Sequence, residues 1–305
     1  MRRINVVLKR FFIILLSTML TVFVFPVSVS AAETSVAFYQ PDLFSDFHSE
    51  DLTLYAKGAV LIDCDNNRIL YGKNANTPMP NASTTKILTA YLAITQANPD
   101  DTVTISEHAA DQASDSSVCG MRAGDRIKLS DLLYGLMLKS GNDAAVAIAE
   151  HISGSEEAFA ELMNETARSF GATNSHFVNA NGLHDEDHYT CVYDLYLIFA
   201  HAIEEDFFMQ LIQTTSYTVY YTDASGTQAS QTWTNTNKYL NGEVTQPDGI
   251  TVLGGKTGTT NAAGYCLVLL SNNDKKEPVI SVILKSDGRS NLYYVMNQVL
   301  ANFAK

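Results

Sequence analysis

A serine and a lysine three positions apart, Ser83 and Lys86, stand at the start of an apolar helical run in the segment NASTTKILTAYLAITQ, residues 81–96. Positions i and i+3 of a helix share a face, so Lys86 can lie beside the Ser83 hydroxyl. A serine hydroxyl is a weak nucleophile that needs a base within hydrogen-bonding reach. The spacing therefore suggests nucleophilic catalysis, although serine at a helix start is also an ordinary cap.

Two further short motifs follow in the chain, Ser140-Gly141-Asn142 and Lys256-Thr257-Gly258. Lysine acts as a base only when burial or a second cation lowers its pKa, and Lys256 can be that cation for Lys86. Ser140 can pass protons between the lysines and a leaving amine, and Asn142 can orient Lys86 and a substrate amide. An S-x-x-K match arises by chance about once in such a chain, whereas the ordered set is expected in well under about one chain in a hundred.

Apolar patterns place these motifs on a mixed framework of strands and helices. We expect strands over residues 57–63, 68–72, 216–222, 251–259, 263–271 and 278–286, and helices over 83–96, 129–139, 144–152, 155–170, 191–203 and 291–303. Ser130 and Ser155 are expected to cap two of these helices. The order predicts an α/β fold of the α+β type, with one antiparallel sheet built from both chain ends, flanked by helices, and a helical lobe of about residues 97–215 inserted.

The N-terminus has the order of a secretory signal: basic residues, an apolar run and then small residues. The run is about 15 residues, shorter than the roughly 20 that span a bilayer, so we expect cleavage near Ala31 or Ala32, with an uncleaved anchor as the alternative. Residues 1–31 are then the signal, 32–54 a lead-in segment and 55–305 the catalytic domain. Residues 1–31 hold four of the 20 basic residues and none of the 33 acidic ones, which leaves a net charge of −17. Such an acidic protein is a poor partner for nucleic acids or anionic membranes.

The remaining reactive side chains are predicted to be structural. Cys64, Cys119, Cys191 and Cys266 lie far apart without a C-x-x-C pair, and most are expected to be small core residues, with disulfides left open. His151, His184 and His188 show no catalytic partner in the sequence. His184 and His188 form the one close pair, but on a loop without H-E-x-x-H, so no zinc site is indicated.

The three motifs in this order resemble the penicillin-recognising serine enzymes. The stretches GAVLIDCDNNRILYGKNANTPMPNASTTK, AGDRIKLSDLLYGLMLKSGNDAAVAIAEHISGS, FVNANGLHDEDHYT and GGKTGTTNAAGYCLVLLS are similar to the low-molecular-mass penicillin-binding proteins that act as D-alanyl-D-alanine carboxypeptidases. The resemblance covers roughly residues 55–300. It implies a β-lactamase/transpeptidase-like fold and a cell-wall enzyme that removes the terminal D-Ala from peptidoglycan stem peptides.

The resemblance also implies a role for each motif residue. Ser83 is acylated with Lys86 as its general base, and Ser140 and Asn142 shuttle protons and hold the substrate. The substrate-binding strand presents Lys256 and Thr257 to the terminal carboxylate of the peptide, or to the acid group of a β-lactam. Gly258 and Thr259 continue that strand, and the N–H groups of Ser83 and Thr259 form the oxyanion hole. No metal or cofactor is required.

Two other functions remain open at this point: a β-lactamase of related fold, and a penicillin-binding module that is acylated but barely turns over. A β-lactamase usually shows S-D-N where this chain has Ser140-Gly141-Asn142. It also has a Glu-bearing loop that activates the deacylating water, and we find no counterpart to that loop. Only 47 residues follow Gly258, whereas many relatives add a C-terminal β-rich domain and a membrane-anchoring helix. We therefore expect an exported protein in the periplasm, cell wall or medium. Arg289 is either an extra carboxylate-binding group or an ordinary surface residue.

Overall fold

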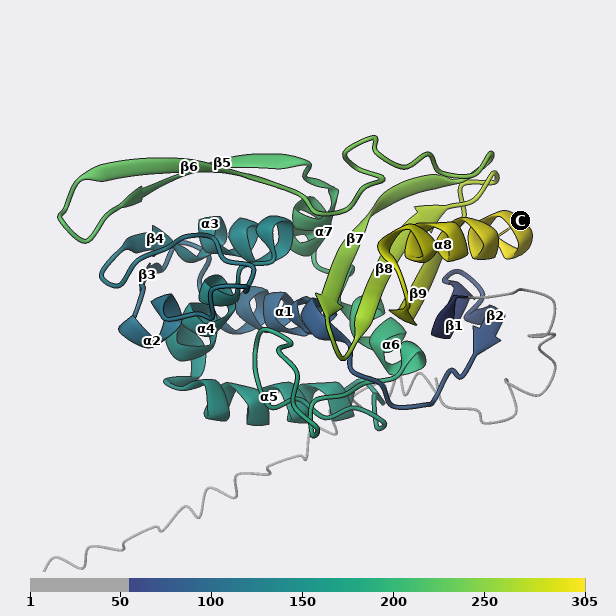
Figure 1. Ribbon diagram of the computed structural model, residues 1–305, viewed down its shortest axis with the longest axis horizontal. Helices are drawn as coiled ribbons and strands as arrows, with labels where there is room; N and C mark the ends of the chain where they lie inside the picture. Colours follow the sequence, from purple (N-terminus) through teal and green to yellow (C-terminus); the bar gives the residue numbers. More distant parts are fainter. Residues whose placement is uncertain (1–54, 305) are drawn as a thin grey trace, which may run out of the picture. The chain divides into compact units, whose positions relative to one another are not determined.

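Strands from both ends of the chain pair in one five-stranded antiparallel sheet (Figure 1). The protein is represented by a computed structural model that describes residues 55–304, so the expected signal and lead-in segments lie outside the described residues. The sheet has the order β2-β1-β9-β8-β7. Its strands are β1 (Ala56–Asp63), β2 (Arg68–Lys73), β7 (Thr251–Thr260), β8 (Gly264–Asn272) and β9 (Pro278–Ser286).

Both faces of this sheet are covered, which explains why its strands have nearly continuous apolar sequences. Successive residues of a strand point to opposite faces. Leu267 and Leu269 of β8 pack with the C-terminal helix α8 (Arg289–Phe303), while Val268 and Leu270 face the larger cluster formed with the helices on the other side. Alternate residues of one apolar run are therefore buried on opposite faces of the sheet.

Seven helices lie between β2 and β7. They are α1 (Lys86–Gln96), α2 (Glu107–Ala110), α3 (Leu129–Tyr134), α4 (Asn142–Ser153), α5 (Glu156–Ser169), α6 (Val192–Ala202) and α7 (Asp206–Gln213). Helix α6 packs against β1 and β9, on the face opposite α8. The expected cap of α5 is confirmed, because Ser155 Oγ accepts a hydrogen bond from the Ala158 N–H at 3.2 Å. The expected cap at Ser130 is wrong: Lys128, the last residue of a strand, takes the cap position and makes no side-chain cap.

The expected helix over 83–96 is split in two. Residues Ala82–Thr85 form a 3₁₀ turn, and α1 begins only at Lys86. The turn starts at Ala82, whose φ of 49° lies in the left-handed region. Ser83 is therefore presented on a tight turn that leads into α1, and it does not cap that helix.

A second, four-stranded sheet has the order β3-β4-β5-β6. Its strands are β3 (Thr102–Thr104), β4 (Arg126–Lys128), β5 (Ser216–Thr222) and β6 (Gln228–Thr234). The sequence patterns predicted only β5, because β3 and β4 have three residues each and β6 is mostly polar. Among the residues that the structure describes, we find no helix with the length and hydropathy needed to cross a membrane.

Candidate active site

Three oxygen atoms surround the amine of Lys86. Lys86 is the first residue of α1, and its side chain is fully buried. Its Nζ lies 2.9 Å from Ser83 Oγ, 2.8 Å from Asn142 Oδ1 and 2.6 Å from the main-chain oxygen of Asn181. Serine and lysine of the first motif therefore meet, together with the asparagine of the second motif.

This environment favours a neutral lysine. Burial lowers the pKa of Lys86 well below its ordinary value, and the positive charge of Lys256 lowers it further. A neutral amine has two N–H groups and one lone pair. The two carbonyl oxygens, of Asn142 and Asn181, can only accept hydrogen bonds, so they take both N–H groups. The lone pair then points at Ser83 Oγ, which is the geometry that a general base needs.

Lys256 of β7 forms a second buried amine beside the first. Its Nζ donates to Ser140 Oγ at 2.9 Å and to the main-chain oxygen of Thr257 at 2.8 Å. Burial lowers the pKa of Lys256 to about 7. Ser140 has a φ of 62° and ends the π-helical turn Gly135–Lys139 just before α4. The break in the helix thus turns the Ser140 hydroxyl toward Lys256.

Close packing explains the glycine of the second motif. A side chain at Gly141 would collide with Cys119 Sγ and with the carboxylate of Asp143. That carboxylate accepts the N–H groups of Cys119, Gly120 and Met121 at 2.8, 2.9 and 3.1 Å. Asp143 therefore holds the segment around Cys119 against the start of α4. The sequence carried no signal for this role of Asp143.

The glycine of the third motif lets β7 lie directly on the 3₁₀ turn. A Cβ atom at Gly258 would be 2.9 Å from the main-chain oxygen of Asn81 and 3.0 Å from the nitrogens of Ser83 and Thr84. Real Cβ atoms essentially never approach other atoms so closely, so only glycine fits without movement. This contact brings the backbone of β7 beside Ser83.

Two cavities meet at Ser83, one of about 350 Å³ and one of about 470 Å³. Ser83, Ser117 and Thr259 line both. The smaller cavity extends toward α8 and includes Ser140, Asn235, Thr236, Lys238, Thr257, Gly258 and Arg289. The larger cavity includes Asp115, Asn142, Asn181, Leu183, His184 and Asn261. All eight predicted site residues therefore gather at one cleft, with Lys86 and Lys256 buried beneath its floor.

His188 and the cysteines occupy structural positions, whereas His184 lines the larger cavity. His188 is buried, and its pKa is lowered by burial to about 4. The N–H of Val178 donates to His188 Nδ1 at 3.2 Å, so Nε2 carries the proton and donates to Thr85 Oγ1 at 2.8 Å. All four cysteines are free thiols, and three of them are buried. The expectation that most cysteines are core residues is confirmed.

Sequence reasoning missed the main-chain oxygen of Asn181 and the hydroxyl of Thr236. Thr236 Oγ1 lies 2.6 Å from Thr257 Oγ1 in the smaller cavity. Asn181 belongs to the stretch FVNANGLHDEDHYT, which carries the family resemblance. A main-chain acceptor has no residue type to reveal it, so no sequence signal identified this contact.

The Ser83 hydroxyl lies on a tight turn with the buried amine of Lys86 at 2.9 Å, beside an open antiparallel sheet, and this arrangement is typical of serine peptidases that use a serine and a lysine. A profile described as D-alanyl-D-alanine carboxypeptidase matches residues 45–288. The chain belongs to this D-alanyl-D-alanine carboxypeptidase family.

Curated relatives and solved structures agree with this assignment. The D-alanyl-D-alanine carboxypeptidase DacF of Bacillus subtilis is 36% identical over 226 residues, which are 72% of this chain and 54% of the relative. The D-alanyl-D-alanine carboxypeptidase of Streptomyces sp. strain K15 is 33% identical over 77% of this chain and 82% of its own length. The crystal structure of the Streptomyces K15 DD-transpeptidase superposes with a TM-score of 0.75 at 30% identity, covering 82% of this chain and 97% of that one. The chain thus spans about half of the Bacillus relative and most of the Streptomyces one.

Proposed function

We propose that this protein is a serine-type D-alanyl-D-alanine carboxypeptidase. Ser83 Oγ attacks the carbonyl carbon of the penultimate D-Ala, and its proton passes to Lys86 as the new C–O bond forms. The C–N bond then breaks, the leaving amine takes up a proton, and free D-Ala departs. Water hydrolyses the acyl-enzyme in a second step. The observation that carries this proposal is the buried Lys86 amine, 2.9 Å from Ser83 Oγ, with two carbonyl oxygens taking its N–H groups.

The oxyanion is stabilised by the N–H groups of Ser83 and Thr259. β7 is the edge strand of its sheet, so every second residue turns its N–H and C=O groups away from β8. The main-chain oxygen of Thr257 accepts a bond from Lys256 Nζ, and Thr259 lies two residues further along the strand. This alternation supports an N–H of Thr259 directed toward the cleft, where two N–H donors stabilise the developing charge.

The terminal carboxylate of the substrate binds on the cationic side of the cleft. Lys256 lies beneath the smaller cavity, and Thr257 and Arg289 line it. The guanidinium of Arg289 lies 5.7 Å from the centre of the Tyr265 ring, which orients it in that cavity. Ser140, which is hydrogen-bonded to Lys256, donates the proton that the leaving amine takes up. We assign the same groups to the acid group of β-lactams, which acylate Ser83.

We assign this protein to the cell wall, outside the cytoplasm. Support comes from the signal-like order of residues 1–31 and from the names of the relatives, which act on D-Ala-D-Ala. Peptidoglycan stem peptides that end in D-Ala-D-Ala are the natural partners.

Labelling with a fluorescent penicillin tests the mechanism. We expect the wild-type protein to be labelled and to release D-Ala from a diacyl-D-Ala-D-Ala peptide, and we expect Ser83→Ala to abolish both. Labelling that survives Ser83→Ala would contradict the mechanism. Rapid penicillin hydrolysis without D-Ala release would instead favour the β-lactamase alternative.

The acyl-enzyme can also pass to an amine acceptor, and the name DD-transpeptidase of the K15 structure favours testing this second outcome. Adding glycine to the peptide assay separates the two reactions. Transfer gives a new peptide product at the expense of the hydrolysed one, whereas D-Ala release continues in either case.

A further inference from the structure

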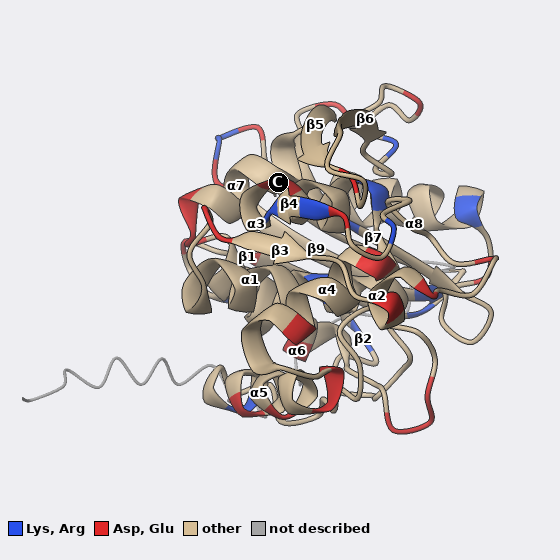
Figure 2. Cartoon of the chain, turned by 90° about the vertical axis from the view of Figure 1, so that its left-hand side faces the viewer, with Lys and Arg blue, Asp and Glu red and all other residues tan. Residues whose placement is uncertain are grey.

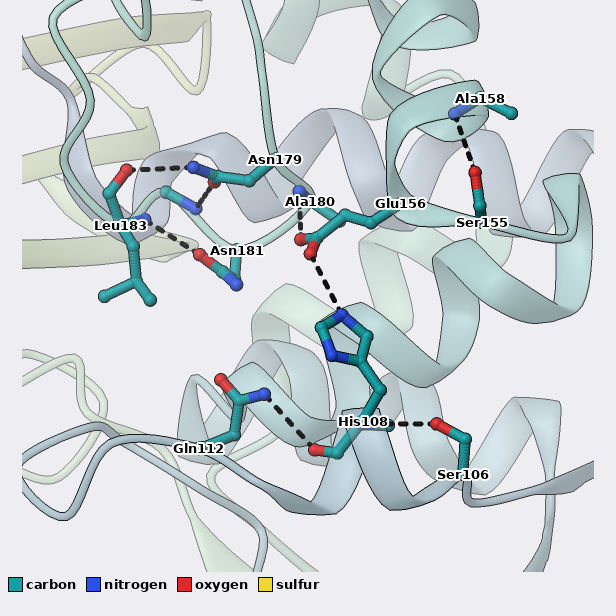
Figure 3. A network of polar contacts seen from close by, with 12 residues as sticks. Ser106, His108, Gln112, Ser155, Glu156, Ala158, Asn179, Ala180, Asn181 and Leu183 are labelled. Carbon is teal, nitrogen blue, oxygen red and sulfur yellow. Dashed lines mark hydrogen bonds and ion pairs between the residues drawn. The ribbon is translucent and has the colours of Figure 1, made fainter.

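The main-chain oxygen of Asn181, which faces Lys86, belongs to a turn of residues 179–183 that is held by internal hydrogen bonds (Figure 3). The N–H of Gly182 donates to Asn179 Oδ1 at 2.7 Å, and the N–H of Leu183 donates to Asn181 Oδ1 at 2.8 Å. Asn179 Nδ2 closes the turn by donating to the oxygen of Leu183 at 3.0 Å. A side chain at Gly182 would collide with the main-chain oxygen of Ala82, so the turn packs directly on the 3₁₀ turn that carries Ser83.

Two helices hold this turn at Ala180. The N–H of Ala180 donates to Glu156 Oε1 at 3.1 Å, and the oxygen of Ala180 accepts from Thr89 Oγ1 at 2.6 Å. Thr89 lies on α1 three residues after Lys86, and Glu156 is the first residue of α5. Both main-chain polar groups of Ala180 are therefore hydrogen-bonded, immediately before the residue whose oxygen contacts Lys86.

We propose that Glu156 is a positioning residue for catalysis, which holds the oxygen of Asn181 against Lys86 through the N–H of Ala180. This inference rests on the proposed role of Lys86 as general base. If the Asn181 oxygen moves away, one N–H of neutral Lys86 loses its acceptor. The amine can then rotate so that this N–H, and not the lone pair, points at Ser83 Oγ. A carboxylate suits this task because hydrogen bonds to charged acceptors are about twice as strong as neutral ones.

The surroundings of Glu156 support a dedicated role. Acidic residues occur along α5 and at α2 (Figure 2), and most face solvent. Glu156 instead turns inward, with one carboxylate oxygen on Ala180 and the other 3.8 Å from His108 Nε2 of α2 (Figure 3). Burial and Lys256 lower the pKa of Lys86, while the carboxylates of Asp143 and Glu156, together with Cys119, act in the opposite direction.

Two substitutions of Glu156 separate its hydrogen bond from its charge. Glu156→Ala removes both, and we expect the rate constant of Ser83 acylation by penicillin to fall on the order of 10- to 100-fold, as for other small misplacements of reacting groups. Glu156→Gln keeps an oxygen acceptor for Ala180, so acylation should stay within about threefold of wild type at its optimum. Losing the negative charge lowers the pKa of Lys86, so the acid limb of the pH–rate profile should move to lower pH.

Glu161→Gln is the matched control, since Glu161 is an exposed residue on the same helix and loses the same charge. It should leave both the rate and the profile unchanged. Acylation of Glu156→Ala at the wild-type rate would overturn the proposal, and so would a loss of rate in Glu156→Gln as large as that in Glu156→Ala. If Glu156→Ala does not fold, as judged by circular dichroism, the acylation rate of Glu156→Gln decides alone: a rate more than about threefold below that of Glu161→Gln would overturn the proposal, because the amide keeps the oxygen acceptor for Ala180. Failure of the wild-type protein to be labelled would contradict the proposed function itself, and is distinct from these outcomes.

Discussion

At the scale of residues, the site depends on two lysines that are both fully buried. An ammonium group loses its hydration on burial, so each lysine has a lowered pKa, and the positive charge of Lys256 lowers the pKa of Lys86 further. Neither amine forms an ion pair among the described residues; hydroxyl and carbonyl oxygens surround both. This uncompensated burial favours the neutral form of Lys86, which the proposed role as a base requires.

Replacing Lys256 should shift the pH dependence of acylation. Lys256→Met removes the positive charge that lowers the pKa of Lys86, so that pKa rises and the acid limb moves to higher pH. The rate at the optimum should also fall, because the β-lactam carboxylate loses a partner. Pre-steady-state labelling between about pH 5 and 9 measures both effects. Lys275→Met, on an exposed turn, is the control, and an acid limb that does not move would contradict the coupling.

At the scale of elements, the proposed catalysis requires direct packing of the β7 backbone against the backbone of the 3₁₀ turn. These elements come from opposite ends of the catalytic domain, and Gly258 is the position where they meet. The 179–183 turn packs on the same 3₁₀ turn, at Gly182 and Ala82. Two glycine contacts thus fix the 3₁₀ turn that carries Ser83.

A methyl group at position 258 should separate β7 from the 3₁₀ turn. For Gly258→Ala we expect a loss of about 1–3 kcal/mol in the free energy of unfolding, as for other overpacked sites, and a fall in acylation on the order of 100-fold. Gly72→Ala on β2 is the control, because a Cβ there would meet its nearest atom at an ordinary 3.9 Å. Denaturant titration and penicillin labelling measure the two effects, and wild-type acylation by Gly258→Ala would refute the steric argument.

At the scale of the whole molecule, the described domain is stabilised by packing on both faces of its main sheet, without disulfides. A domain of this size buries enough apolar surface to fold without cross-links. Burial raises the pKa of Cys64 to about 12 and that of Cys266 to about 12 as well. The thiols are therefore protonated at neutral pH and poorly reactive.

Thiol titration tests this prediction directly. In the native protein we expect the three buried cysteines to react with Ellman's reagent at least about 100-fold more slowly than a free thiol, because burial blocks access and keeps them protonated, and the half-buried Cys64 to react slowly because its raised pKa keeps it protonated. In urea, without reductant, all four should react at once. The fluorescence of Trp233, the one tryptophan of the chain, reports unfolding in the same sample. Fewer than four reactive thiols in urea would reveal a disulfide and refute the prediction.

The sequence by itself determined the α+β class, the strands of the main sheet and the three motifs that gather at the cleft. These features depend on local patterns: apolar alternation, helical spacing, and reactive residue types in a fixed order. Only the tertiary structure revealed the second sheet and the 3₁₀ turn at Ser83. It also revealed the hydrogen bond between Lys86 and the main-chain oxygen of Asn181, and the one between Ala180 and Glu156. Lys86 and Asn181 are 95 positions apart, and a main-chain oxygen is the same in every residue type. Only the packing of distant segments determines which of these oxygens faces the base.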